Sequence, residues 1–519
     1  MPWSSEFLDA LDSGRSDRMF RLDVPVWGTQ GVGLAWSVGT HSSQSPLDSG
    51  CHIIAQSVSS SSSRVAIGTW TLAQGGFTVQ VAGDVAGVLQ HMTRGSVVNL
   101  SMGFIGWSKS QYQRIAMGVL RNITGTPPLW TLQFDSLLMA LRNRITTTRT
   151  SLQLFDGVDS STTVGVGGYT AGALTLTVVD SSGFEADSAA GREGLVRVTP
   201  TTGDPFYLAW SGSTSTTFTV EATARLGTTA VDAVSGDLVE EIGYVQGTIP
   251  DIVRRILVSS GTASTNGTYD TLPSTWGYNI PSTIVDDAGF DAYRDNALVD
   301  TAGATYEWDL WTDAPQSNGL AWLTAKLSTA GVWLLQVQGD ITLRCAQDPN
   351  ATTRQVSAGY VIRDKNIVPG SVQWEGWDSS VAVEYGSSQM TTADGSDPLL
   401  DSPDVLATLP AGQTKTRDLS TVLFSAGSAV RDGDLSRIGP WDLRIPERLT
   451  MQIAGLWMAR YAPGDMGTLY TTQAFGRFDV AGTAYNNRRV TITEISPNWA
   501  GASVLVTFAV LPSSGTEFA

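Results

Sequence analysis

Alternating strands and turns between residues 178 and 220 constrain the fold of this chain more than any other feature. The run begins at Val178–Phe184 and passes through Gly194–Val198 and Phe206–Gly212 to Thr216–Val220. Its β-branched and aromatic residues are those enriched in strands, and its glycines and serines are typical of turns. The run contains no plausible reacting group. It predicts a small β-barrel or sandwich with a structural role.

The length and composition predict a mainly β, multidomain protein. A chain of 519 residues is too long for one ordinary core, so two to four domains are expected. The 54 glycines, with abundant serine and threonine, favour many strands and turns over long helices. No short internal repeat is evident, which argues against solenoids and propellers.

Four units are predicted along the chain. The first is β-rich, the second is the small barrel or sandwich, the third is α+β, and the fourth returns to β. Their predicted bounds are residues 1–150, 151–245, 246–352 and 353–519.

Helical patterns are few and short. Residues 5–11 can form a helix that begins at a capping serine, and residues 135–141 a second one. In the third unit, Pro250–Leu257 and Leu320–Leu327 have helical spacing, with a proline in the first turn of one and Gly331 after the other. A hairpin is predicted to follow, with Gly339 and Asp340 as its two-residue turn.

Strand patterns fill most of the first and fourth units, and two polar segments separate them. The serine run Ser59–Ser63 is expected to be an exposed, mobile loop, and Ser387–Pro403 a turn-prone loop. The predicted strands are Met19–Val24, Trp70–Leu72, Phe77–Val81, Val97–Met102, Trp130–Phe134, Val381–Tyr385, Val490–Ile495 and Val504–Val510.

The charge of the chain argues against a protein that holds nucleic acid. The formal net charge is −17, and the lysines are Lys109, Lys326, Lys365 and Lys415. Tight DNA binding needs clustered Lys and Arg to displace counterions from phosphates. The acidity suits solubility, and it would also suit a wall past which DNA slides without sticking.

The two cysteines allow at most one disulfide, so a disulfide framework is excluded. Cys345 lies in a strand-like alternation and is expected to be a buried free thiol. Cys51 precedes His52, a pair that without further ligands is a weak metal signal. Neither a secretory signal nor a membrane-spanning run is visible, so synthesis in a cytoplasm is expected.

Catalytic motifs are scarce. The histidines are His41, His52 and His91, and none occurs in a His-Glu-x-x-His pattern. Cys-x-x-Cys, the P-loop and Gly-x-Ser-x-Gly are also absent. Asp286–Asp287 and Glu240–Glu241 are carboxylate pairs by adjacency alone, and neighbours on a strand point to opposite faces. We therefore assign no catalytic, cofactor-binding or metal-binding residue and expect neither an enzyme nor a cofactor.

The 17 tryptophans have two interpretations. Trp374 and Trp377, beside Glu375 and Asp378, could form a platform on which a sugar stacks. Most others lie within apolar patterns and are better explained as core or interface anchors. This second group comprises Trp107, Trp130, Trp210, Trp322 and Trp333.

Four stretches taken in order resemble the baseplate-hub or tail-tip hub proteins of tailed bacteriophages. The resemblance spans most of the chain, and its weight comes from the order of the stretches. The first stretch combines Gly68–Leu72, Gly75–Phe77, Arg94–Val98 and Trp130–Asp135; the second combines Val179–Phe184 and Thr216–Thr219; the third combines Arg255–Gly261, Gly267–Pro273 and Trp276–Gly277; the fourth is Pro463–Asp465 near a C-terminal β region.

The resemblance implies a structural virion protein at the tail tip or baseplate. Such hubs are homotrimers in which each chain has two β-barrel domains similar to tail-tube subunits. Three chains then present a pseudo-sixfold ring that adapts a sixfold tube to a threefold tip, with DNA and the tape-measure protein passing through its lumen. Here the first and fourth units would be the tube-like barrels, and the second and third units would lie outside them.

The implied partners are tail-tube or distal tail proteins, the tape-measure protein, and spike or fibre proteins. Because the chain ends at Ala519 soon after its last predicted strand, a separate spike protein is expected. Two alternatives remain: a glycan-binding or glycan-cleaving tail protein, and a hexameric distal tail ring protein. The host, the tail type, the lumen and interface residues and the fate of Cys51 stay open.

Overall fold

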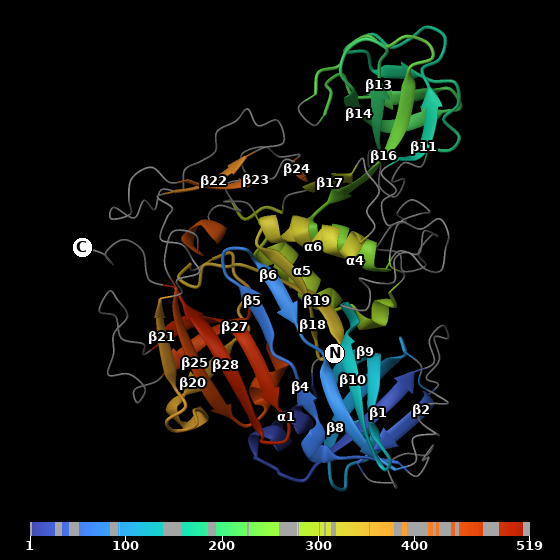
Figure 1. The fold of residues 1–519 in the computed structure, drawn as a ribbon. Coiled ribbons are helices and arrows are strands. Elements are labelled where there is room, and N and C mark those ends of the chain that lie inside the picture. The colour runs from blue at the N-terminus through green and yellow to red at the C-terminus, as the bar shows by residue number, and fades with distance from the viewer. Residues whose placement is uncertain are drawn as a thin grey trace, which may run out of the picture.

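A computed structural model shows a mainly β architecture in which two large sheets lie side by side beneath a layer of helices, while a smaller β unit projects from them (Figure 1). The predicted fold class, mainly β with a smaller α+β part, is confirmed. The structure describes residues 3–25, 34–40, 51–83, 92, 94–138, 158–184, 194–225, 228–258, 278, 280–299, 302–305, 308–312, 318–351, 353–377, 387–391, 414–418, 422–424, 437–441, 446–470 and 487–511.

The first large sheet has the strand order β2-β1-β8-β9-β10-β7-β3, with β4 also paired to β7. In β7 every second residue is buried, as period-2 alternation predicts for a strand with one face on a core. Its strands are β1 (Arg18–Pro25), β2 (Leu34–Gly39), β3 (His52–Ile53), β4 (Ser59–Ser60), β7 (Phe77–Ala82), β8 (Val97–Phe104), β9 (Gln113–Thr126) and β10 (Leu129–Ser136).

The second large sheet has the strand order β20-β26-β27-β28-β25-β21. A hairpin from the N-terminal part of the chain joins it, because β5 pairs with both β6 and β27. Its strands are β20 (Tyr360–Arg363), β21 (Gln373–Trp377), β25 (Glu447–Ala454), β26 (Met466–Tyr470), β27 (Arg488–Asn498) and β28 (Ser503–Val510), joined by β5 (Ser63–Ala66) and β6 (Thr71–Gln74).

The projecting β unit surrounds its own core, which includes Trp210, Phe206 and Phe218. Strand β16 links this unit to the rest, because its first half pairs with β11 and β13 and its second half with β17. The strands are β11 (Val158–Thr163), β12 (Thr175–Thr177), β13 (Gly194–Thr199), β14 (Phe206–Thr214), β15 (Thr217–Val220) and β16 (Leu238–Gly247), followed by β17 (Trp308–Thr312) and β24 (Val422–Phe424).

The helical layer packs on the β18–β19 hairpin and on one end of the first large sheet. Its core joins residues of the helices to Val97, Met117 and Val119 of the sheet. The helices are α4 (Ile249–Val258), α5 (Asp287–Asn296) and α6 (Gly319–Thr329), and the hairpin consists of β18 (Val332–Val337) and β19 (Asp340–Cys345). Elsewhere α1 (Ser5–Asp12) begins at Ser4, whose hydroxyl accepts a hydrogen bond from the backbone of Phe7.

The remaining elements are short. Strands β22 (Ser387–Thr391) and β23 (Thr414–Asp418) form a parallel pair, and residues 437–441 form one helical turn. The 3-10 turns are η2 (Ala55–Ser57), η3 (Lys109–Gln111), η4 (Ser282–Ile284), η5 (Asp364–Asn366) and η6 (Trp457–Arg460).

Several local predictions are corrected by the structure. The serine run forms β4 and the start of β5 rather than a free loop, because Ser60 and Ser63 pair with the two large sheets. Part of the predicted loop that starts at Ser387 is strand β22. Asp135 lies in β10, where it pairs with Val119 of β9, and the helix predicted over residues 135–141 begins instead at Leu137, of which the structure describes Leu137 and Leu138.

The predicted hairpin turn is also shifted by one residue. Asp340 pairs with Val337, so Gln338 and Gly339 are the two turn residues. Both have positive φ, 54° and 93°, as a type I′ turn requires at its two central positions. The strand predicted at Val381–Tyr385 lies outside the described residues, and the four domain boundaries stay a prediction.

The two large sheets repeat one topology. Strands β7, β8, β9 and β10 occupy the spatial order 7-10-9-8, and β25, β26, β27 and β28 occupy the order 25-28-27-26. The β9–β10 and β27–β28 pairs both contain one bulged residue, Arg121 in β9 and Thr493 in β27. Beyond the bulge, five paired residues remain in each strand, Asn122–Thr126 and Glu494–Asn498. The repeat therefore holds residue by residue.

Neighbouring segments follow the same register. Phe77–Ala82 and Leu449–Ala454 pair with matching stretches of β10 and β28. Gly95 donates to the carbonyl of Leu120, and Gly464 donates to that of Ile492 at the matching place. The repeat ends at the next strand, because β1 pairs antiparallel with β8 whereas β20 pairs parallel with β26.

Candidate functional site at the junction of the two large sheets

The two large sheets share one hydrophobic core, so their junction is rigid and central to the molecule. That core contains Phe20 and Leu100 from the first sheet together with Met451 and Phe508 from the second. Helix α1 contributes Phe7, which is fully buried. Burial of this apolar surface holds the sheets in one fixed relation, since interiors packed at such density do not deform continuously.

The N-terminal segment fastens the two sheets together. The indole of Trp3 donates a hydrogen bond of 2.9 Å to the carbonyl of Arg114 in β9. The ring of Phe7 lies 5.0 Å from that of Trp3 and 6.0 Å from that of Phe104, in the edge and tilted geometries that aromatic pairs favour. The same helix contacts η6, which belongs to the second sheet.

Between β4 and β5 the chain crosses from one sheet to the other. Ser60 pairs with Phe77 of the first sheet, and three residues later Ser63 pairs with Ile495 of the second. The crossing is fixed by the indole of Trp499, which donates a hydrogen bond of 2.7 Å to the Ser60 hydroxyl. A serine is suited to this place because its hydroxyl can accept while its backbone stays extended.

Three tryptophans clamp the hairpin that follows. Trp70 stacks on Trp333 at 5.8 Å with ring planes 5° apart, and it meets Trp441 edge-on at 5.8 Å. All three are at least 98% buried. The indoles of Trp333 and Trp441 donate to the carbonyls of Pro463 and Gln347. Hairpin β5–β6 is thus attached to the second sheet and to the β18–β19 hairpin.

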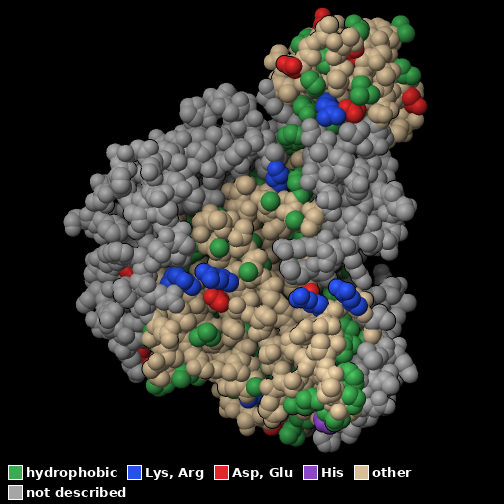
Figure 2. Space-filling model, viewed as in Figure 1, with side chains coloured by type: hydrophobic (Ala, Val, Ile, Leu, Met, Phe, Trp, Pro, Cys, Tyr) green, Lys and Arg blue, Asp and Glu red, His purple; other side chains and the backbone are tan. Residues whose placement is uncertain are grey.

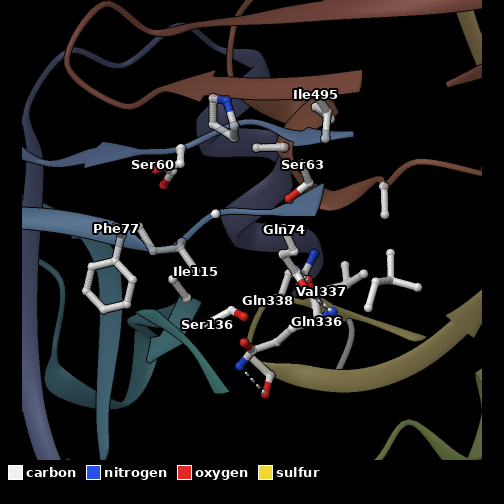
Figure 3. Close-up of a pocket in the computed structure, with 18 of the residues that line it drawn as sticks. Ser60, Ser63, Gln74, Phe77, Ile115, Ser136, Gln336, Val337, Gln338 and Ile495 are labelled. Carbon is white, nitrogen blue, oxygen red and sulfur yellow. Dashed lines mark hydrogen bonds between the residues drawn. The ribbon is translucent and has the colours of Figure 1, made fainter. Parts of the chain in front are cut away.

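A small pocket of about 100 Å³ lies where the sheets and the β18–β19 hairpin meet (Figure 3). Figure 3 shows the side chain of Gln74 next to Gln336, with which it forms hydrogen bonds. Gln336 accepts from the backbone of Leu137 and donates to Gly339, while Gln74 accepts from the backbone of Gln336 at 2.9 Å. Both side-chain amides are therefore occupied by hydrogen bonds that join neighbouring elements of the fold. Apart from one tyrosine, the lining has no ionisable side chain.

A second pocket of about 440 Å³ lies between α1, α5 and the β18–β19 hairpin. Two ion pairs lie at this pocket: the Nε of Arg344 lies 2.6 Å from Asp465 Oδ1, and Arg114 forms an ion pair with Asp340. Asp286 and Arg460 also line it, where Asp286 accepts from the backbone of Gly289 and Arg460 donates to the Tyr461 hydroxyl. Burial is the largest single influence and lowers the pKa of Arg344, but Asp465 together with Tyr293 and Asp286 raises it by more, so the pKa of Arg344 is raised overall. These pairs tie the hairpin to both sheets.

The candidate carboxylate pairs are also accounted for structurally. Glu240 forms an ion pair with Arg197 at 2.7 Å, while its neighbour Glu241 is buried on the other face of the strand. Asp286 caps α5 by accepting from Gly289 at 3.1 Å. Asp287 begins the same helix, so the argument from strand faces does not apply to this pair.

The other candidates are scattered. Cys51 and Cys345 are both buried free thiols, which confirms the expectation for Cys345. His52 is exposed on β3, and His41 and His91 lie outside the described residues. Among the described residues, no group of three or more His, Cys, Asp or Glu could hold a metal ion. In that part of the chain, the helices are also too short or too polar to cross a membrane.

The side chains of the tryptophans predicted as anchors are buried or partly buried. Trp210 and Trp333 are 1% exposed, and Trp107, Trp130 and Trp322 are partly buried against the cores. The proposed sugar platform cannot be placed in the same way, because only the backbone of Trp374 and Trp377, in β21, is described. Sequence reasoning missed the junction itself, since no motif announces a crossing between sheets.

Fold and junction together define a multidomain β protein with a duplicated sheet. No protein-family model and no curated protein matches the sequence. Solved structures similar to the chain include the 43 kDa tail protein of prophage MuSo2 from Shewanella oneidensis, with 8% identity and a TM-score of 0.35 over 96% of this chain and 99% of that one.

Two further similar structures bear related names. The prophage tail protein gp18 from Listeria monocytogenes has 8% identity and a TM-score of 0.34, over 95% of this chain and 94% of that one. A chain from the virion of a native gene transfer agent particle has 14% identity and a TM-score of 0.17, over 43% of this chain and 78% of that one. Two of these three structures are named as prophage tail proteins, and the third is named as part of a gene transfer agent virion.

Proposed function

We propose that the chain is a structural protein of a phage tail, the hub of a tail tip or baseplate, where three copies form a pseudo-sixfold ring. The ring would join the tail tube to the tip. Its partners would be tube or distal tail proteins on one side and spike or fibre proteins on the other, with the tape-measure protein passing through. In this role the protein works in the virion and catalyses no reaction.

One observation carries the proposal: the two large sheets repeat the same topology and register within one chain. Each copy therefore offers two nearly equivalent building blocks in a fixed relation. Three copies supply six blocks, and a closed ring of three is a common solution for identical subunits joined head to tail. Such a ring would present sixfold-like contacts to a tube and threefold contacts to a tip.

The charge of the chain supports passage of DNA without binding. A net charge of −17 gives a field that repels phosphates, and tight DNA binding would instead require clustered basic groups. On the face shown in Figure 2, basic and acidic side chains are both scattered, and several basic ones lie beside acidic ones. An assembled structure whose lumen is lined by arginine would contradict this part of the proposal.

The paired charges at the junction support a structural role. Arg344 and Asp465 connect elements that lie 121 residues apart in the sequence, and Arg114 and Asp340 connect elements 226 apart. Groups committed in this way stabilise an arrangement and are not poised to exchange protons with a substrate.

The solution mass of the purified protein tests the proposal. Native mass spectrometry and light scattering should give three times the mass of the 55.1 kDa chain. A hexamer would overturn the hub and favour a distal tail ring. A monomer that binds or cleaves host surface polysaccharide would overturn it in favour of a glycan-recognising tail protein, since a hub should do neither.

A further inference from the structure

The repeat between the sheets exposes a difference at one strand edge. In β27 the residues beyond the bulge are no longer covered by β26, and β5 takes this edge through the pairs Arg64–Glu494 and Ser63–Ile495. In β9 the matching residues are Asn122 and Ile123, beyond the reach of β8. Among the residues that the structure describes, nothing pairs with this side of β9.

Burial differs in the same way. At the bulge, Thr493 is 5% exposed, whereas the side chain of its counterpart Arg121 is 65% exposed. Ile495 is 5% exposed, and its counterpart Ile123 is only partly buried. Asn122 is exposed. The second sheet is thus covered at a place where the first sheet, within the described residues, is not.

Open strand edges attract further strands, and proteins commonly protect them with charged residues, proline, bulges or a covering element. The bulge and the charge of Arg121 lie at one end of this edge, and residues Asn122–Thr126 beyond it include no charged residue and no proline. Main-chain hydrogen bonds along such an edge are a standard means by which one chain binds another. The stretch is therefore suited to receive a strand.

The repeat also indicates which strand this is. In the first sheet, the chain leaves β4 after Ser60 and becomes β5, which covers β27. In the second sheet, Trp374 of β21 pairs with Leu449 of β25, just as Ser60 of β4 pairs with Phe77 of β7 in the first sheet. Leu449 and Phe77 are matching positions of the repeat, so Trp374 matches Ser60. The segment that follows Trp374 therefore starts where the one that forms β5 starts. It stays paired with β25 as far as Trp377, opposite Glu447, as the last strand of its sheet.

We propose that the edge of β9 at Asn122–Thr124 receives the β21 end of a second copy of the chain. The inference rests on the proposed trimeric ring and identifies the strands that would close it. Within one copy, β5, which follows the first sheet's β4, covers the edge of β27 in the second sheet. Between copies, β21 of the second sheet in one copy would cover the edge of β9 in the first sheet of the next. One kind of contact then repeats six times around the ring, three times inside a chain and three times between chains.

Cysteine cross-linking tests this contact directly. The native cysteines are buried, so thiols introduced at the surface are the reactive ones. The double variant Asn122→Cys/Trp377→Cys, treated with a short bismaleimide, should shift most of the chain from the monomer band to dimer and trimer bands on a denaturing gel. Each single variant should stay monomeric. The trimer should be the largest species, because the ring closes at three.

A matched control uses the other sheet. Glu494 occupies the place of Asn122, but β5 already covers it, so Glu494→Cys/Trp377→Cys should give no ladder. A ladder of equal strength there would overturn the inference, as would a trimeric mass without cross-links in the first pair. A monomeric mass without cross-links would instead contradict the ring itself. If Asn122→Cys fails to fold by circular dichroism, Thr124→Cys on the same exposed segment replaces it.

Discussion

Two serines fix matching bends at the edges of the two large sheets. The hydroxyl of Ser57 donates to the carbonyl of Ile54 at 2.6 Å and accepts from the backbone of Gln80 at 2.7 Å. The hydroxyl of Ser371 donates to Val368 at 2.6 Å and accepts from Gln452 at 3.1 Å. A side chain that bridges two backbone groups in this way replaces a ladder hydrogen bond where the strand bends.

Replacing either serine should therefore cost a similar amount of stability. Ser57→Ala and Ser371→Ala leave the backbone N–H of Gln80 and of Gln452, respectively, without its acceptor, while the carbonyls of Ile54 and Val368 keep a backbone partner. We expect each substitution to lower the free energy of unfolding by about 1–3 kcal/mol. Denaturant titration of the two variants measures this loss. Ser59→Ala, at an exposed position of the same segment, should change it by less than about 0.5 kcal/mol. Clearly different losses of unfolding free energy in Ser57→Ala and Ser371→Ala would show that the two serines are not equivalent.

Asp237 makes the projecting β unit sensitive to acid. Its carboxylate accepts from the hydroxyl and backbone of Thr201, at 2.5 and 2.9 Å, and from the backbone of Val234 at 2.7 Å. The Thr201 hydroxyl is the largest cause of its lowered pKa. Because the folded pKa lies below the unfolded one, the stabilisation is complete above about pH 4 and is lost as pH falls through the folded pKa.

Asp237→Asn should remove this acid-dependent stability. The amide of asparagine cannot accept from both Val234 and Thr201, so we expect a loss of about 1–3 kcal/mol at pH 7 that shrinks as the pH is lowered below 4. Thermal unfolding between pH 7 and pH 3 measures the difference between the two proteins. A difference that stays constant down to pH 3 would show that the carboxylate charge plays no part.

At the scale of elements, the strands with regular alternation were predictable and the ones set by distant partners were not. The patterns at Met19–Val24, Phe77–Val81 and Val504–Val510 correspond to β1, β7 and β28. Strand β9 was missed, because its outer half is exposed on both faces and lacks alternation. Helix α5 was missed as well, since its apolar positions are too few to define a stripe.

The repeat itself was beyond sequence reasoning. Between β7 and β25 the matching residues Thr78 and Thr450, Gln80 and Gln452, and Ala82 and Ala454 are identical, but this is three positions in six. Most other matches conserve only burial, because a sheet needs the alternation and tolerates many residues within it. Only the register of strand pairing, which the sequence does not show, reveals that the two large sheets are equivalent.

The hairpin β5–β6 depends on the tryptophan clamp. Trp70→Ala removes a fully packed indole, and we expect it to lower the free energy of unfolding by about 3–5 kcal/mol. The hairpin should also open locally, so trypsin should cut at Arg64 under conditions in which the parent chain is resistant. Trp107→Ala, at a partly buried position outside the clamp, should destabilise less and leave Arg64 protected. Equal protection in both variants would argue against the clamp.

At the scale of the molecule, the projecting β unit is an insertion. Val158 of β11 lies opposite Ile242 of β16, so the strands by which the chain enters and leaves the unit are neighbours. The unit also has a core separate from those of the large sheets. Its residues are therefore not needed to hold the two large sheets together.

Removal of this unit should leave the remainder folded. Replacing residues 159–241 by a short glycine–serine linker keeps the ends within reach, because paired strands lie about 5 Å apart. We expect the shortened chain to unfold cooperatively and to keep the oligomeric state of the full chain. Differential scanning calorimetry and native mass spectrometry measure both. Aggregation or a changed subunit number would show that the unit takes part in folding or assembly.

Adjacent entry and exit strands make this position a natural cassette. A foreign domain whose own termini lie close together could take its place without rerouting any other strand. Recombination at such a locus would exchange what a virion displays while sparing the scaffold beneath it. For engineering, the same locus offers one place per chain for displaying a cargo, held by the two large sheets beneath it.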